Sequence, residues 1–329
     1  MVRTRISLLA FMLASVLLAV TPAASAGEVV LYSSNSVEAI NTVVDEFNRK
    51  YPDIRISPVR GSTGAMMQRI KAEAANPRAD IFWSGGFPLL GVYREYFTSY
   101  RSPETEAVAE RFRGPGDLWL GTNAHVMVIM VNKRALKGDA APRTWSDLAD
   151  PKWKDRLAIG DPEKTSSSYA TLWGINEMLG KEPLKGIARN ATMMSTASQV
   201  YEGVAKGEFA VGMTMEYAAQ EYVAGGQKDI QIVYPSEGTF IAPEGMALVK
   251  GAKNPGEARK FFDFLAAKST QELLANKFYR RPIREDIDTT RMGLPRINAI
   301  KVQPIDDAKA TASQPGFIAT WKEMVATAK

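Results

Sequence analysis

Short apolar runs alternate with helical patterns near the start of the chain. The runs EVVLYSS (28–34), IRISPV (54–59) and ADIFWSG (79–85) have the composition of strands. Residues 37–50 and about 63–75 carry apolar side chains at helical spacing between those runs. Because strand and helix alternate through short loops, this order predicts a parallel sheet covered by helices. We therefore assign the chain to the α/β class.

Small polar residues stand where the predicted strands end. The segments SSNS (33–36), RGSTG (60–64) and WSGG (83–86) each follow a strand, and ligands bind at this edge of parallel sheets. RGSTG also leads into a helix, whose first N–H groups are unpaired and partly positive. Ser62 and Thr63 are therefore candidates for holding an anion, and a simple helix cap is the alternative reading.

A second block repeats the same arrangement about a hundred residues later. HVMVIMVN (125–132) reads as a long strand, and KTSSSYATLWGINEMLG (164–180) places a cluster of hydroxyl residues where a helix begins. FAVGMTM (209–215) is a further strand, and a helix follows it. Two such blocks facing each other would grip one anion between opposed helix N-termini. The second set of candidates is Thr165, Ser166 and Ser167.

The N-terminus has the pattern of an export signal. A basic start, MVRTR, precedes an apolar run over residues 6–20 and an Ala24–Ser25–Ala26 cleavage pattern. We expect residues 1–26 to be a signal peptide that is cleaved after Ala26, with an uncleaved membrane anchor as the alternative. The expected location is the periplasm.

Composition excludes several classes of function. The chain has no cysteine, which rules out disulfide scaffolds and thiolate chemistry, and it has one histidine. Without residues 1–26 it carries 39 basic and 36 acidic residues, a net charge of +3, which does not call for nucleic acid. A mature chain of about 300 residues predicts two lobes. We expect a monomer without a cofactor.

The chain resembles the type II periplasmic solute-binding proteins of ABC importers. The resemblance rests on the YSS strand end, on FNRKYPDIRI (47–56) and on RGSTGAMMQRIKAEAANPRADIFWSGG (60–86). It is strongest for the branch that contains ferric-ion, 2-aminoethylphosphonate and hexose-phosphate receptors. The family implies two lobes joined by crossing strands, here HVMVIMVN and EGMALVK. The implied limits are 27–126 plus 245–329 for lobe 1 and 127–244 for lobe 2.

The resemblance also suggests how a ligand would be held. In the ferric branch an adjacent tyrosine pair opens the helix after the 209–215 strand, whereas here Tyr217 stands between Glu216 and Ala218. Ferric iron, with Tyr217 and Glu216 as ligands, therefore remains the alternative. The phosphorylated-organic branch has a T-x-E pattern there, which Thr214 and Glu216 match. Glu216 is then expected to meet an ammonium group or sugar hydroxyls at the far end of the ligand.

Several further residues are candidates for the site or for the structure around it. Ser34 joins the anion-binding set, and Trp83 either walls the ligand or packs in the core. Tyr201 is a lesser candidate, Arg280, Arg281 and Arg284 read as structural, and His125 is expected to be a core or hinge residue.

The sequence therefore predicts a receptor that delivers a small phosphorylated or phosphonate anion to an inner-membrane ABC permease. A polyamine or thiamine-type binder and a periplasmic phosphoesterase are further alternatives. An enzyme is not expected, because one histidine and no cysteine leave only serines and carboxylates, and no G-x-S-x-G or S-x-x-K motif stands in a strand-to-helix context.

Overall fold

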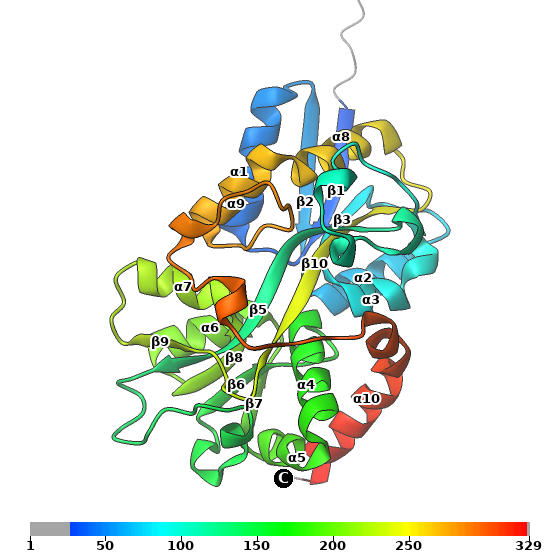
Figure 1. Cartoon of the computed structure of the whole chain (residues 1–329). Coiled ribbons are helices and arrows are strands. Elements are labelled where there is room, and N and C mark those ends of the chain that lie inside the picture. The colour runs from blue at the N-terminus through cyan, green and yellow to red at the C-terminus, as the bar shows by residue number, and fades with distance from the viewer. Residues whose placement is uncertain (1–26, 328–329) are drawn as a thin grey trace, which may run out of the picture.

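The three N-terminal strands pair in parallel, as the alternating pattern predicts (Figure 1). Strand β1 (Gly27–Ser33) lies between β2 (Ile54–Arg60) and β3 (Ile81–Gly86). Helices α1 (Val37–Lys50) and α2 (Thr63–Ala72) make the crossover connections. The α/β assignment is confirmed, and the loops after these strands meet at one edge of the sheet.

The structure is a computed structural model and describes residues 27–327. The predicted signal peptide, residues 1–26, and its cleavage after Ala26 lie outside the described residues. None of the helices within 27–327 combines the length and the apolar character that a bilayer crossing requires.

A second α/β unit also has parallel strands that are connected by helices. Its strands β8 (Val211–Met215), β6 (Leu157–Gly160) and β7 (Ala191–Met194) are consecutive in the sheet. The helices of this unit and its remaining strand are α4 (Ser166–Leu179), α5 (Lys181–Asn190), α6 (Ala197–Lys206), α7 (Glu216–Ala224) and β9 (Ile230–Val233).

Two long antiparallel strands connect the units. Strand β5 (Leu120–Asn132) pairs with β8, and β10 (Thr239–Val249) pairs with β3, while β5 and β10 pair with each other. The result is one sheet in the order β2-β1-β3-β10-β5-β8-β6-β7. Both strands extend beyond the crossing segments expected from the sequence, because their N-terminal residues also find ladder partners.

Each lobe has its own hydrophobic core. In the first, Phe47 of α1 packs edge-on against Phe261 of α8 (Pro255–Ala266), with ring centroids 5.0 Å apart. In the second, Trp145 and Trp153 are fully buried. The smaller elements of the fold are α3 (Phe87–Val92), β4 (Phe97–Thr98), α9 (Lys268–Phe278) and β11 (Val302–Gln303).

The C-terminal helix α10 (Asp307–Thr327) touches both lobes. It packs against α3 on one side and against α4 and α5 on the other. Thr311 donates a hydrogen bond to the Pro88 carbonyl at 3.2 Å, whereas Trp321 is buried in the core of the second lobe. We propose that the chain passes between the lobes at 126/127 and at 244/245, and that α10 forms a strap across both lobes.

Candidate functional site

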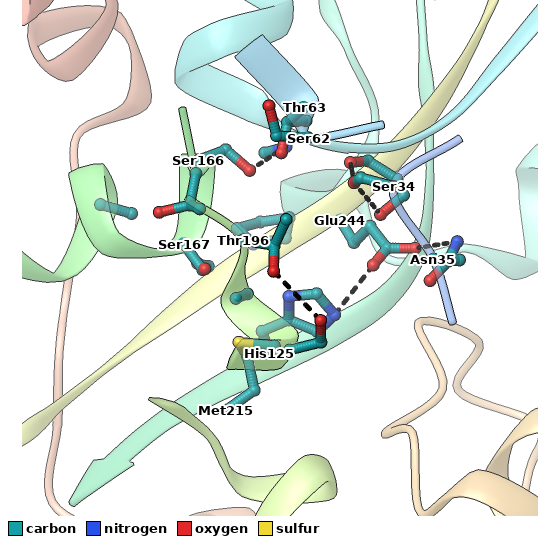
Figure 2. Close-up of a pocket in the computed structure, with 18 of the residues that line it drawn as sticks. Ser34, Asn35, Ser62, Thr63, His125, Ser166, Ser167, Thr196, Met215 and Glu244 are labelled. Atoms are coloured by element: carbon teal, nitrogen blue, oxygen red, sulfur yellow. Dashed lines mark hydrogen bonds and ion pairs between the residues drawn. The ribbon is translucent and has the colours of Figure 1, made fainter. Parts of the chain in front are cut away.

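A cavity of about 230 Å³ lies where the two lobes meet, beside the crossing strands (Figure 2). Helices α1, α2, α4 and α6 all begin at its wall, and their N-cap residues line it. Helix N-termini offer unpaired N–H groups and partial positive charge. The four N-cap residues are Ser36, Ser62, Thr165 and Thr196. An arrangement of this kind suits an anion.

Most of the residues expected from the sequence line this cavity. Those that do are Ser34, Ser62, Thr63, Thr165, Ser166, Ser167 and Tyr217. They come from both lobes, and Figure 2 shows Ser62 and Thr63 opposite Ser166. The two helix starts are in direct contact, because the Gly64 N–H donates to the Lys164 carbonyl at 3.1 Å. A ligand in the cavity would therefore touch both lobes at once.

The hydroxyl groups at the two helix starts have different roles. Ser62 is a true N-cap, since its Oγ accepts from the Ala65 N–H at 3.3 Å. Thr165 does not cap α4, because its Oγ1 instead donates to the Asp161 carbonyl at 3.0 Å. Among residues 27–327, no side chain caps the first turn of α4. Its N–H groups remain available to an anion.

The end of β3 carries a backbone conformation that is rare for a side-chain-bearing residue. Ser84 has a φ of 102° and lines the cavity. Its Oγ lies 2.8 Å from the Oγ of Ser34, which also donates to the Ser84 carbonyl at 3.0 Å. Such conformations cost about 1–3 kcal/mol and concentrate at binding sites. The Ser34–Ser84 pair holds this turn in place.

Trp83 and Thr214 do not reach the cavity lining. Trp83 is fully buried in the core of the first lobe, and its indole N–H donates to Thr122 Oγ1 at 3.2 Å. Thr214 is 2% exposed and lies in β8 opposite Val128. For Trp83 the structure agrees with core packing, which was the alternative interpretation.

Glu216 lies next to the cavity, but its carboxylate is already occupied. It is 1% exposed and forms a bidentate ion pair with Arg281, at 2.6 and 2.9 Å. The Tyr234 hydroxyl donates to Glu216 Oε1 at 2.6 Å. Because these partners take up both oxygens, Glu216 has little capacity left for a ligand. The carboxylate expected to meet the far end of the ligand instead fastens α7 to the segment after α9.

A second buried carboxylate does line the cavity. Glu244 of β10 lies 3.0 Å from His125 Nε2 and 3.5 Å from the Arg280 guanidinium. Burial alone would raise the pKa of Glu244, but His125, Arg280 and Asn35 outweigh it and lower the pKa to about 2. Glu244 is therefore ionised at neutral pH, and its charge is balanced within the protein.

His125, expected to be a core or hinge residue, is buried in a crossing strand and also lines the cavity. It belongs to β5 and is 8% exposed, and its ring lies tilted at 41° to that of Tyr217, with the centroids 5.2 Å apart. The sequence places it in an apolar strand, so the crossing partner that carries Glu244 is needed to reveal its position. Thr196, the N-cap of α6, was also missed as a site residue, although Thr196 and Gln199 form a capping box that the sequence displays.

The tyrosines favour their neutral form. Burial raises the pKa of Tyr201 and Tyr217 well above the ordinary range, and Arg280, 4.8 Å over the Tyr217 ring, offsets only part of the rise. Within residues 27–327, no three histidine, aspartate or glutamate side chains are grouped to hold a metal ion. The donor set is therefore a poor match for ferric iron, which prefers anionic oxygen ligands.

Two α/β lobes joined by crossing strands, with a polar cavity between them, define the class of type II periplasmic binding proteins. The periplasmic binding protein AfuA from Actinobacillus pleuropneumoniae, solved with fructose 6-phosphate, aligns with a TM-score of 0.84. The alignment covers 91% of this chain and 98% of AfuA at 24% identity, a level that establishes the fold alone. The chain belongs to the family described as bacterial extracellular solute-binding protein, whose model matches residues 76–309.

Curated relatives differ in the ligand that their names record. Iron uptake protein A1 of Synechocystis is 26% identical, over 78% of this chain and 76% of that protein. A putative 2-aminoethylphosphonate-binding periplasmic protein of Salmonella typhi is 22% identical, over 72% of each chain. The protein is thus a solute-binding protein of the type that serves ABC importers. The names of its relatives do not agree on one ligand, so the chemistry of the cavity has to distinguish between them.

Proposed function

We propose that this protein is a periplasmic receptor for a small solute that carries a phosphate or phosphonate group. The observation that supports the proposal is the convergence of four helix N-termini and their hydroxyl residues on one cavity. Neutral donors and helix ends stabilise an anion without a cluster of lysines. Arg60, whose Nε donates to the Asn35 carbonyl at 2.8 Å, adds one positive charge to the lining.

Ferric iron is the alternative ligand, and relatives named for iron support it. The chemistry of the cavity supports it less well. Glu216 and Glu244 are paired with arginines, and the nearby phenols hold their protons. A ferric ion would have to break these pairs or ionise a buried phenol. The phosphorus ligand requires neither.

Delivery to a permease follows from how such a site works. A ligand that touches α2 in one lobe and α4 in the other favours the state in which the lobes are closed. A membrane permease of the ABC type would then receive the closed, loaded receptor. We propose capture and release, not turnover, as the activity, with the protein acting as a monomer.

Thermal unfolding of the mature protein, stripped of ligand by refolding, tests the proposal. Fructose 6-phosphate, 2-aminoethylphosphonate, inorganic phosphate and ferric citrate are added separately, with sodium sulfate as the anion control. A ligand at roughly 100 times its Kd stabilises the folded state by about 2.7 kcal/mol. A phosphorus compound should therefore raise the Tm by several degrees, whereas sulfate should not. A rise with ferric citrate alone would refute the phosphorus ligand.

A further inference from the structure

We propose that Asp307, at the start of α10, holds an ammonium group carried by the solute. The proposal rests on the function proposed for this protein, a phosphorus receptor, and deepens it. The helix N-termini would take the phosphorus group, and Asp307 would recognise a positive charge elsewhere in the same small molecule. The preferred solute is therefore a zwitterion that joins a phosphate or phosphonate to an amine.

Two carboxylates lie in the part of the cavity wall that residues 27–327 form, and only one of them is paired. Glu244 lies 3.0 Å from His125 Nε2 and 3.5 Å from the Arg280 guanidinium, so nitrogen groups of the protein already face it. Asp307 also lines the cavity, but its Oδ1 is buried and has no hydrogen-bond partner within that range of residues. A buried oxygen of this kind costs free energy until a donor reaches it.

Capping of α10 does not account for the Asp307 side chain. The cap is Asp306, whose Oδ1 accepts from the Lys309 N–H at 2.9 Å and whose carbonyl accepts from the Ala310 N–H at 2.8 Å. A carboxylate in the first turn also favours the helix through its dipole, but an exposed carboxylate would do so without losing contact with water. The place of Asp307 in the cavity wall therefore points to the solute.

The start of α10 is held by both lobes, which fixes the position of Asp307. The Thr311 hydroxyl contacts the Pro88 carbonyl of the first lobe and also lies 2.7 Å from the Asp307 carbonyl. From the second lobe, the Tyr169 hydroxyl of α4 donates to the Ala310 carbonyl. A solute bound to Asp307 would thus be held by α10 as well as by the helix starts of the two lobes.

The charge of Asp307 favours an ammonium group over a hydroxyl or a second anion. Burial, helped by Asp306, raises the pKa of Asp307 to about 6, so the carboxylate is still mostly ionised at neutral pH. No positive side chain within residues 27–327 offsets this rise. An ammonium group supplies the missing counter-charge together with a charge-assisted hydrogen bond. A hydroxyl supplies only a weaker hydrogen bond, and a second anion is repelled.

Three phosphonates that differ only at one end test the proposal by isothermal titration. On the same two-carbon chain, 2-aminoethylphosphonate carries an ammonium group, 2-hydroxyethylphosphonate a hydroxyl, and ethylphosphonate neither. Wild type should bind the ammonium compound about tenfold more tightly than the other two. Asp307→Asn should weaken 2-aminoethylphosphonate about tenfold and change the other two by no more than about twofold.

Asp306→Asn is the matched control. It removes a carboxylate from the neighbouring, exposed position, and asparagine caps a helix as well as aspartate does. It should change the binding of all three phosphonates by no more than about twofold. Thermal unfolding checks that the variants fold, and Asp307→Ser, which also suits a helix start, serves as a second variant with the same expected pattern.

The outcomes separate the role of Asp307 from the proposed function. Equal binding of the three phosphonates by wild type, or a preference for 2-aminoethylphosphonate that persists in Asp307→Asn, would overturn that role alone. Equal losses for all three in Asp307→Asn would do the same, since Asp307 would then act through the fold. Binding of fructose 6-phosphate or inorganic phosphate without any of the phosphonates would also overturn only the role of Asp307. If wild type binds none of these five compounds, the proposed function fails as well.

Discussion

The two buried carboxylates beside the cavity, Glu216 and Glu244, each have an arginine partner. Arg281 pairs with the first at 2.6 Å and Arg280 with the second at 3.5 Å, and both arginines belong to the segment after α9. Opposite charges this close compensate the cost of burial, so neither carboxylate is a free acceptor for a cationic ligand. The two adjacent arginines were expected to be structural. They also neutralise the two buried carboxylates beside the cavity.

Glu216→Gln should destabilise the protein and leave its ligand preference unchanged. The substitution leaves Arg281 buried without its counter-charge, and breaking a buried pair in this way costs about 3 kcal/mol. Urea unfolding should show the loss in the free energy of unfolding. The ratio of the affinities for 2-aminoethylphosphonate and inorganic phosphate should stay the same.

The control for this substitution is Glu182→Gln. Glu182 pairs with Lys185 on the exposed face of α5, with 83% of its side chain exposed, so its loss should not measurably alter stability. A selective loss of 2-aminoethylphosphonate binding in Glu216→Gln would contradict the structural role and restore Glu216 as the group that recognises the ligand.

At the scale of elements, the sequence predicts where the helices begin, but it does not predict how the two crossing strands pair. RGSTG and TSSS follow strands and precede apolar periodicity, so local pattern places Ser62 and Ser166 at helix N-termini. His125 and Glu244 are brought together only by the pairing of β5 with β10, which no local pattern encodes. Helix α10 was also missed, since its weak amphipathicity gives little periodic signal.

Gly64→Ala should impair closure of the lobes. An added Cβ would lie 2.6 Å from the backbone carbonyl oxygen of Glu163, across the contact between α2 and the loop before α4. Overpacking against backbone costs about 1–3 kcal/mol. We therefore expect fructose 6-phosphate to bind about 5- to 150-fold more weakly. Small-angle X-ray scattering should also show a larger radius of gyration.

Gly256→Ala is the matched control. Gly256 also lies in the first turn of a helix, but its added Cβ would have no neighbour within 4 Å. Alanine favours helix over glycine by about 1 kcal/mol, so this variant should be as stable as wild type or slightly more so. Tight binding by Gly64→Ala would show that the lobes close without the α2 contact.

For the whole molecule, α10 decides how far the lobes can move independently. It contributes Thr311 to a contact with α3 and Trp321 to the core of the second lobe. The crossing strands β5 and β10 join the same two lobes through the middle of the sheet (Figure 1). Opening of the cleft must therefore bend the crossing strands and slide or release one face of α10.

Trp321→Ala should lower the free energy of unfolding by about 3–5 kcal/mol, because it empties a site that is 2% exposed. Urea unfolding followed by circular dichroism measures the change. The neighbouring Lys322→Ala removes an ion pair with Glu163 whose side chains are 57% and 52% exposed, and should cost no more than about 1 kcal/mol. Equal effects of the two substitutions would mean that α10 is not anchored through Trp321.

The ends of the described chain lie on opposite lobes. Residue 27 opens β1 in the first lobe, and α10 finishes beside α5 in the second (Figure 1). The chain has no cysteine, so two introduced thiols, one near each end, would be its sole labelling points. A donor and an acceptor dye at these points would change their energy transfer as the lobes move. The labelled protein would thus report binding of its solute as a change in fluorescence, with no alteration to the cavity.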